Sequence, residues 1–308
     1  MTDFCYWLFN MSIVASITAA VILLLRPVRK IPRRVITILW LIPFLRAVIP
    51  VGVGSKFSLM SWLSGFATKT VVIHRTRVHN LPQWLYSQTN CVQMASGYYP
   101  VTLKTNLLEE VFEAASAVWA MVTLALIIAL AIVCFATVRE LRDAEHLYDN
   151  VYCSPKVSTP AVYGVFRPRI ILPTSLKDSE RLDKVLLHER CHIRRWDNFW
   201  RVIAILTAVI HWFNPLAWVC LKLYLSDAET ACDEKALSGL TDEGRTEYAH
   251  ALLDVQESRT VFASAFGGAK LRTRIERIVS FKKMTVFSAV GFGVLVAFIA
   301  FVLLTNAA

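Results

Sequence analysis

The stretch Leu187-His188-Glu189-Arg190-Cys191-His192 contains the pattern H-E-x-x-H. On a helix, His188 and His192 lie one turn apart on the same face, so both imidazoles can bind one zinc ion. Glu189 projects beside them, where its carboxylate can take a proton from zinc-bound water and act as the catalytic base. The alternative is a polar helix face that happens to carry two histidines. A second motif is needed to decide between these interpretations.

A catalytic zinc ion has three protein ligands and one open position. The candidate for the third ligand is Glu229, in the stretch Asp227-Ala228-Glu229-Thr230-Ala231-Cys232-Asp233. Asp233, one helical turn later, can accept a hydrogen bond from the far ring nitrogen of a ligating histidine. Either acid alone would suit a solvated helix face. Together with the upstream motif, they predict a zinc peptidase.

Two further motifs carry a family resemblance. His211-Trp212-Phe213-Asn214-Pro215 lies between the two zinc motifs, and Gly164-x-Phe166-x-Pro168-x-Ile170-x-x-Pro173 precedes them. Taken in the order in which they occur along the chain, the four motifs resemble those of the BlaR/MecR family of membrane gluzincin peptidases. The resemblance implies a mainly α, multi-pass helical membrane protein with an embedded gluzincin-type zinc peptidase domain, which carries a small β-hairpin or sheet. The implied activity is that of a zinc metalloendopeptidase, with Zn2+ as its cofactor.

The resemblance also suggests what is cleaved. The family includes the β-lactam sensor-transducers that trigger destruction of a DNA-bound repressor, so we expect the substrate to be a cytoplasmic repressor or the chain itself, in signal transduction. Those sensor-transducers carry a penicillin-binding domain after their last membrane helix. This chain stops at Ala308, and we therefore expect no such antibiotic sensor. Whether the chain forms a homodimer is left open.

Two alternatives remain at this point. One is a housekeeping membrane protease that resembles the prenyl-protein or heat-shock gluzincins. The other is a non-catalytic signalling or scaffold protein with a structural zinc. Intact Glu189 argues against the second, because a structural site needs no general base.

The composition is typical of a membrane protein, with 56% hydrophobic and 18% charged residues and a mean hydropathy of +0.49. The net charge of +10 could indicate nucleic-acid binding. The basic residues, however, sit largely beside apolar spans, so we expect a lipid bilayer as partner and no direct contact with nucleic acid. The seven cysteines form no C-x-x-C pair and indicate no thiolate zinc site. Cys5 and Cys91 are both expected outside the cell, and the sequence leaves their pairing open.

Four apolar stretches are long enough to span a bilayer, at about 4–25, 35–53, 111–138 and 284–304. The loop Arg26–Arg34 holds five cations, so the positive-inside rule places it in the cytoplasm. Both termini then lie outside a bacterial plasma membrane, and the active site faces the cytoplasm. Arg46 interrupts the second stretch and lies either near the outer headgroups or against another helix.

The predicted organisation has five parts. Residues 1–53 hold two membrane helices, 54–108 form an external loop, 109–138 hold the third membrane helix, 139–283 form the peptidase domain, and 284–308 hold the last helix. The external loop is rich in Trp and Tyr. It either packs at the membrane interface or senses a stimulus.

Residues 199–225 pose the main question of topology. They could form one membrane helix, but Asn214-Pro215 breaks the run near its middle. A full crossing would separate Glu229 from His188 and His192, and it would place the cations at 270–283 outside. We therefore predict a re-entrant hairpin that turns at 211–215, with Asn214 capping the broken end. His211 is expected to be a buried turn residue, with a role in polarising the substrate as the alternative.

The peptidase domain contains further short elements. Residues 161–163 and 169–172 are β-prone runs separated by Gly164 and Pro168, and they form either an edge strand that holds an extended substrate or a plain hairpin. Ser179 is a plausible N-cap for the helix that carries the zinc motif. Residues 241–262 suggest a polar-faced helix, and residues 271–278 suggest a basic amphipathic helix that lies on anionic headgroups.

Overall fold

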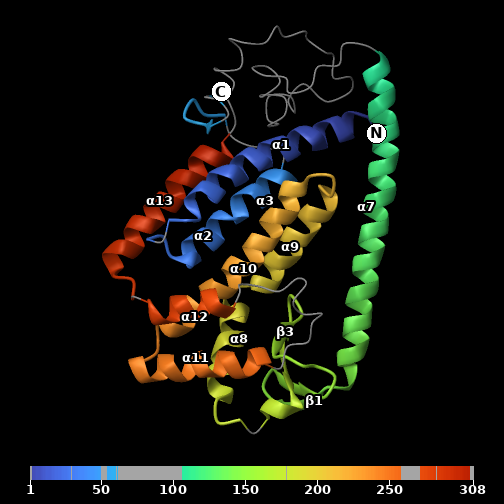
Figure 1. Ribbon diagram of the computed structural model, residues 1–308. Helices are drawn as coiled ribbons and strands as arrows, with labels where there is room; N and C mark the ends of the chain where they lie inside the picture. The colour runs from blue at the N-terminus through green and yellow to red at the C-terminus, as the bar shows by residue number, and fades with distance from the viewer. Residues whose placement is uncertain are drawn as a thin grey trace.

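The computed structural model describes residues 2–28, 30–49, 54–59, 61, 106–177, 179–257, 271–281 and 283–305. Most of the predicted external loop, including Cys91, lies outside these residues, as do residues 258–262 of the predicted polar-faced helix. The described part is mainly helical with one small sheet, as predicted (Figure 1). Its longer helices are α1 (Thr2–Leu25), α2 (Arg33–Leu39), α3 (Leu41–Val48), α7 (Asn106–Glu140), α8 (Leu182–Arg194), α9 (Asp197–Ile210), α10 (Pro215–Leu237), α11 (Asp242–Glu257), α12 (Leu271–Val279) and α13 (Val286–Leu304).

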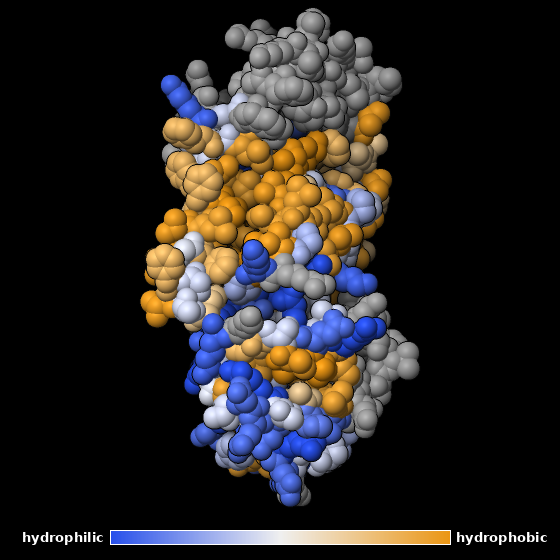
Figure 2. All heavy atoms as spheres, turned by 60° about the vertical axis from the view of Figure 1, so that its left-hand side comes forward, coloured by the Kyte–Doolittle hydropathy of each residue, from blue (hydrophilic) through white to orange (hydrophobic). Residues whose placement is uncertain are grey.

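Three helical segments of the described chain are long and apolar enough to cross a membrane. They are Trp7–Leu25 in α1, Glu113–Asp143 around α7, and Val286–Leu304 in α13. Figure 2 shows hydrophobic side chains gathered over the half of the molecule that contains α13, and hydrophilic side chains over the half that contains α11 and α12. An apolar half and a polar half are the pattern expected of a protein partly immersed in lipid.

The second predicted span, at 35–53, is divided into α2 and α3 at Trp40. Pro43 lies in the first turn of α3, and its ring nitrogen cannot donate a hydrogen bond to the carbonyl of Leu39. Residues 33–48 amount to roughly 24 Å of helix, which is less than the roughly 30 Å of a bilayer's hydrocarbon core. Residues 50–53 lie outside the described part, and a crossing here stays a prediction.

α9 and α10 form a helical hairpin whose turn is held by Asn214. The Asn214 side chain accepts a hydrogen bond from the Leu216 N–H at 2.9 Å, and Pro215 occupies the first turn of α10. The predicted cap is therefore confirmed. The same amide donates to the hydroxyls of Ser12 and Ser16 on α1, both at 2.8 Å. These contacts satisfy the Asn214 side chain within the protein, as a turn at membrane depth would require. At the same turn, His211 Nδ1 and Trp212 Nε1 are buried and have no hydrogen-bond partner among the described residues.

His211, at the same turn, is 2% exposed and its Nε2 lies 3.3 Å from the carbonyl of Ala47. The turn is separated from α8 by the whole of α9, roughly 20 Å of helix. The expectation of a buried turn residue is confirmed, and the separation from α8 argues against the alternative of polarising the substrate.

α7 runs along one side of the molecule (Figure 1), and it contacts α1 and α9. Trp119 Nε1 in α7 donates a hydrogen bond to the carbonyl of Ile210 at 2.8 Å, which joins α7 to the end of α9. Arg46 on α3 makes a similar tie elsewhere: it is 2% exposed and donates to the carbonyls of Leu304 and Thr305, at 2.7 and 2.9 Å. Of the two placements predicted for Arg46, contact with another helix is the one observed.

The sheet contains β1 (Glu145–Tyr148), β2 (Val151–Ser154), β3 (Ala161–Tyr163) and β4 (Arg169–Pro173) in the order β1-β2-β4-β3. β2 and β4 are parallel, while β3 pairs antiparallel with β4 and forms an edge. Gly164 follows β3 with φ +89°, where a Cβ atom would lie 2.8 Å from the carbonyl oxygen of Arg167. The turn between β3 and β4 therefore depends on glycine.

α8 lies between this sheet and α10, with apolar contacts on both sides. Val185 and Leu186 pack with Ile170 and Leu172 of the sheet, while Cys191 packs against α10 and α11. The prediction that Ser179 is the N-cap of this helix is wrong. α8 begins at Leu182 and its N-cap residue is Arg181, whose N–H donates to the Ser179 hydroxyl at 3.3 Å.

Candidate metal centre

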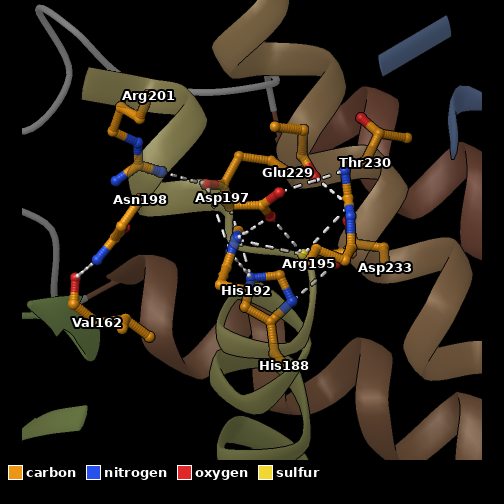
Figure 3. A network of polar contacts seen from close by, with 12 residues as sticks. Val162, His188, His192, Arg195, Asp197, Asn198, Arg201, Glu229, Thr230 and Asp233 are labelled. Carbon is orange, nitrogen blue, oxygen red and sulfur yellow. Dashed lines mark hydrogen bonds and ion pairs between the residues drawn. The ribbon is translucent and has the colours of Figure 1, made fainter. Parts of the chain in front are cut away.

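His188 and His192 face each other from successive turns of α8. Their Nε2 atoms are 3.2 Å apart, and the ring planes meet at 86°. Glu229 reaches them from α10, with Oε2 3.6 Å from His188 Nε2 and Oε1 3.7 Å from His192 Nε2. The structure thus brings together His188, His192 and Glu229, the three ligands predicted from the sequence, and these groups could hold a metal ion (Figure 3).

The far ring nitrogens of both histidines meet buried polar groups. His192 Nδ1 lies 2.7 Å from Oδ2 of Asp197, and His188 Nδ1 lies 2.8 Å from the hydroxyl of Tyr248 and 3.3 Å from Oδ1 of Asp233. The Tyr248 hydroxyl donates to the same Asp233 oxygen at 2.7 Å. With the proton on each Nδ1, both Nε2 lone pairs point toward the other ligand atoms.

Asp233 lies next to the far ring nitrogen of a histidine, as predicted. The contacts of Asp197 and Tyr248 with the two histidines were not predicted. Nor was Arg274, which donates to both Asp233 oxygens at 2.7 and 2.8 Å and is only 4% exposed. Residues 271–278 were expected to turn their cations to lipid headgroups. That expectation is wrong for Arg274, because the buried Asp233 carboxylate requires a charged partner in the interior; Arg272, by contrast, is exposed.

Groups of opposite charge shift one another's pKa values in this centre. Burial alone would lower the pKa of His188, but hydrogen bonds with Asp233 and Glu229 outweigh it and raise that pKa to about 9. Burial would raise the pKa of Glu229, yet the positive charge of His192, the His188 hydrogen bond and Arg274 hold it well below its usual range. Two ring nitrogens and a carboxylate that converge in this way attract a proton or a cation.

Glu189 lies beside the two histidines and is 7% exposed. Among the described residues, it forms no hydrogen bond or ion pair, so its carboxylate is not committed to the protein. It lies close enough to β3 to influence Tyr163, whose pKa is raised by burial and by the charges of Glu140 and Glu189. A free carboxylate beside a metal-binding set can accept a proton.

The sheet edge approaches the same place. Asn198, in the first turn of α9, donates from its amide to the carbonyls of Val162 and Gly164, at 2.9 and 3.0 Å. A cavity of about 120 Å³ lies between this edge and the start of α9, and His192 and Trp196 are among its lining residues. The arrangement places an edge strand and a cavity next to the metal-binding set, which is where a peptide could lie.

A second group of possible ligands shares His192. Cys232 Sγ lies 3.2 Å from both His192 Nδ1 and Asp197 Oδ2, and all three residues are buried. Arg195 already supplies positive charge here, with Nη1 3.4 Å from Cys232 Sγ and Nη2 3.5 Å from Asp197 Oδ1. Because Arg195 already balances the negative charge of Asp197, we interpret this second group as the polar environment of His192 and not as a second metal site.

Comparison with known proteins gives consistent matches. The family model described as BlaR1 peptidase M56 matches residues 6–279. The regulatory protein BlaR1 of Bacillus licheniformis is 31% identical over 138 residues, which are 42% of this chain and 23% of that relative. The methicillin resistance mecR1 protein of Staphylococcus aureus is 27% identical over 104 residues, which are 32% of this chain and 18% of that relative. The chain thus spans less than a quarter of the length of either relative.

Proposed function

Because the chain belongs to the BlaR1 peptidase M56 family, we propose that it is a membrane-embedded zinc endopeptidase. Its ligands are His188, His192 and Glu229, its general base is Glu189, and Asp233 orients His188. The observation that carries the proposal is the convergence of these groups from α8 and α10, together with an uncommitted carboxylate beside them.

The donor set suits zinc in both chemistry and size. Zinc in catalytic sites takes imidazole nitrogen and carboxylate oxygen at about 2.0–2.2 Å, which in a tetrahedron separates neighbouring donors by roughly 3.3–3.5 Å. The separations of 3.2, 3.6 and 3.7 Å are close to these values. Three protein donors leave one position for substrate or water, as catalysis requires.

A zinc ion bound there would polarise the scissile carbonyl and acidify the attacking water. Glu189 would take the proton from that water as its oxygen bonds to the carbonyl carbon. The same carboxylic acid would then give the proton to the departing amine nitrogen as the carbon–nitrogen bond breaks. Asp197 and the Asp233–Tyr248 pair would hold the two imidazoles in the required orientation throughout.

We place the enzyme in a bacterial plasma membrane with its active site toward the cytoplasm and both termini outside. The three apolar segments and the apolar half of the surface support a membrane location. The hairpin of α9 and α10 supports entry and exit on one side at 199–225, because α10 runs back toward α8 (Figure 1), where Glu229 contacts His188 and His192. The basic loop at 26–34 supports the orientation.

The substrate we propose is a cytoplasmic transcriptional repressor or the chain itself, in signal transduction. A comparison of protein N-termini between cells that make the wild type and cells that make Glu189→Ala would test this. New N-termini that depend on Glu189 are expected, and they should persist in the control Glu243→Ala, since Glu243 is exposed on α11. Identical sets of N-termini with and without Glu189, under conditions that produce the protein, would contradict the proposed activity.

A further inference from the structure

Three arginines approach the carboxylates of the metal centre, and they differ in how fully they are engaged. Arg274 is buried and gives two hydrogen bonds to Asp233. Arg195 is bound to the carbonyl of Ala228 at 3.1 Å and to Cys232 and Asp197. Arg201, on α9, has one ion pair and no hydrogen bond among the described residues: its Nη2 lies 3.6 Å from Glu229 Oε1.

Exposure separates Arg201 from the other two in the same way. Its side chain is 38% exposed, against 5% for Arg274 and 20% for Arg195. The two oxygens of Glu229 each face one arginine, with Arg274 Nη1 3.9 Å from Oε2 and Arg201 Nη2 3.6 Å from Oε1. The buried arginine serves the interior of the protein. The exposed one, Arg201, has five N–H donors and no hydrogen bond to use them among the described residues, so they are available to a bound peptide.

We infer that Arg201 is a further catalytic residue, whose guanidinium binds the carbonyl oxygen of the scissile peptide as that oxygen gains negative charge. This inference rests on the peptidase function proposed above. When water attacks the carbonyl carbon, the π electron pair moves to the oxygen, and it returns when the carbon–nitrogen bond breaks. Donors fixed in advance near that oxygen stabilise the transition state more than the ground state.

The fold holds Arg201 in place for this role. Asp197 and Arg201 are one turn apart on α9, so they lie on one face of the helix. Asp197 is bound to His192, and Asn198 in the same turn is bound to the edge of β3 (Figure 3). A single helix therefore links the metal-binding set, the sheet edge and the arginine, so the guanidinium of Arg201 is carried within reach of a peptide that lies along β3.

The test uses the full chain in lipid nanodiscs, saturated with zinc, and two small probes. The first is phosphoryl-leucyl-tryptophan, whose tetrahedral phosphorus and negatively charged oxygens resemble the tetrahedral carbon and charged oxygen that form when water attacks the carbonyl. The second is a hydroxamate of the same dipeptide, which binds zinc without a tetrahedral centre. Calorimetry gives the affinity for each probe, and a separate titration gives the affinity for zinc. The variants are Arg201→Met, Arg201→Lys and the control Arg194→Met, since Arg194 is an exposed arginine on α8.

Arg201→Met should bind the phosphoryl probe roughly tenfold to hundredfold more weakly than the wild type, as expected for the loss of a charge-assisted hydrogen bond. Its affinities for the hydroxamate and for zinc should change little. Arg201→Lys should recover part of the loss, and Arg194→Met should match the wild type. Because the measurements are made at zinc saturation, a lower affinity for zinc cannot by itself reduce the binding of either probe.

Each other result has a definite meaning. If Arg201→Met and the wild type bind the phosphoryl probe equally, the inference is wrong while the proposed peptidase stands. If Arg201→Met loses affinity for zinc and binds both probes equally less well, Arg201 only supports Glu229, and the inference is again wrong. If the zinc-saturated wild type binds neither probe, the proposed peptidase site itself is wrong.

Discussion

Arg26, at the end of α1, forms two hydrogen bonds with Asp227 on α10, from Nε at 2.9 Å and from Nη2 at 3.1 Å. Asp227 also accepts a hydrogen bond from Trp40 Nε1 at 3.0 Å and lies 3.4 Å from Arg33 Nη1. These partners all come from the segment between α1 and α3, while Asp227 is two residues before Glu229. The segment from the end of α1 to the start of α3 is therefore joined directly to the turn of α10 that carries Glu229, the proposed third ligand.

Asp227→Asn should destabilise the protein, because it leaves the partly buried Arg26 and Arg33 guanidiniums without their counter-charge. We expect a loss of roughly 1–3 kcal/mol in unfolding free energy, and a weaker hold on zinc because the same turn positions Glu229. Thermal unfolding of the solubilised protein measures the first, and a zinc titration measures the second. Asp242→Asn is the matched control, since the side chain of Asp242 is 94% exposed. Equal unfolding temperatures for the two variants would contradict this account.

Removing both histidine ligands should remove the metal. In the double variant His188→Ala, His192→Ala, bound zinc per chain should fall sharply, because a single carboxylate does not hold zinc in competition with a chelator. The control is His250→Ala, which changes an exposed histidine on α11. Elemental analysis of the purified proteins measures the content. Near-stoichiometric zinc in the double variant would overturn the ligand assignment.

Zinc binding should weaken as the pH falls. Below its raised pKa of about 9, His188 holds a proton that zinc must displace. With one proton released per ion, the apparent affinity should drop about tenfold for each pH unit below that value. Competition with a chelator at pH 6, 7 and 8, corrected for the titration of the chelator, measures the slope. A constant affinity across this range would show that His188 is already deprotonated.

Glu189→Gln should retain zinc and lose proteolysis. The amide has nearly the shape of the carboxylate, and Glu189 has no hydrogen bond or ion pair to lose among the described residues, so the fold should be unaffected. It cannot accept the proton of the attacking water, and general-base catalysis is typically worth roughly 10²–10⁴-fold in rate. Cleavage of a substrate identified from the cellular N-termini, together with zinc content, gives both readouts. Wild-type cleavage by this variant would mean that another group is the base.

The sequence predicted those parts of the centre that are encoded by local spacing. His188 and His192 are one helical turn apart, as are Glu229 and Asp233, and helix geometry alone places each pair on one face. The turn at Asn214 was predictable because proline cannot continue a helix and asparagine is a strong N-cap. The small sheet near 161–173 followed from its β-prone residues and from Gly164, although the pairing of β2 with β4 did not.

The remainder depends on contacts that no local pattern encodes. Asp197 is five residues after His192, which on a continuous helix would place it about 140° around the axis. It reaches His192 because Trp196 adopts a left-handed conformation, φ 57°, and ends α8. Tyr248 and Arg274 belong to α11 and α12. From the sequence, both helices were expected to turn their polar residues to water or to lipid headgroups. Only the packing of α11 and α12 against α8 and α10 turns these two side chains inward.

The side of the membrane on which the centre lies can be decided by cysteine labelling. Cys134 is the exposed cysteine of the described part, so replacing it and Cys91 leaves a background of buried thiols. Single cysteines at Ser238, just after α10, and at Lys156, after β2, should resist a membrane-impermeant reagent in intact cells and react after permeabilisation. Lys56→Cys, in the predicted external loop, should react in intact cells. If Ser238→Cys and Lys156→Cys both label from outside, the active site faces outward and a cytoplasmic repressor cannot be its substrate. If Ser238→Cys alone does so, the run 199–225 crosses the membrane, and Glu229 could not share a metal with His188 and His192.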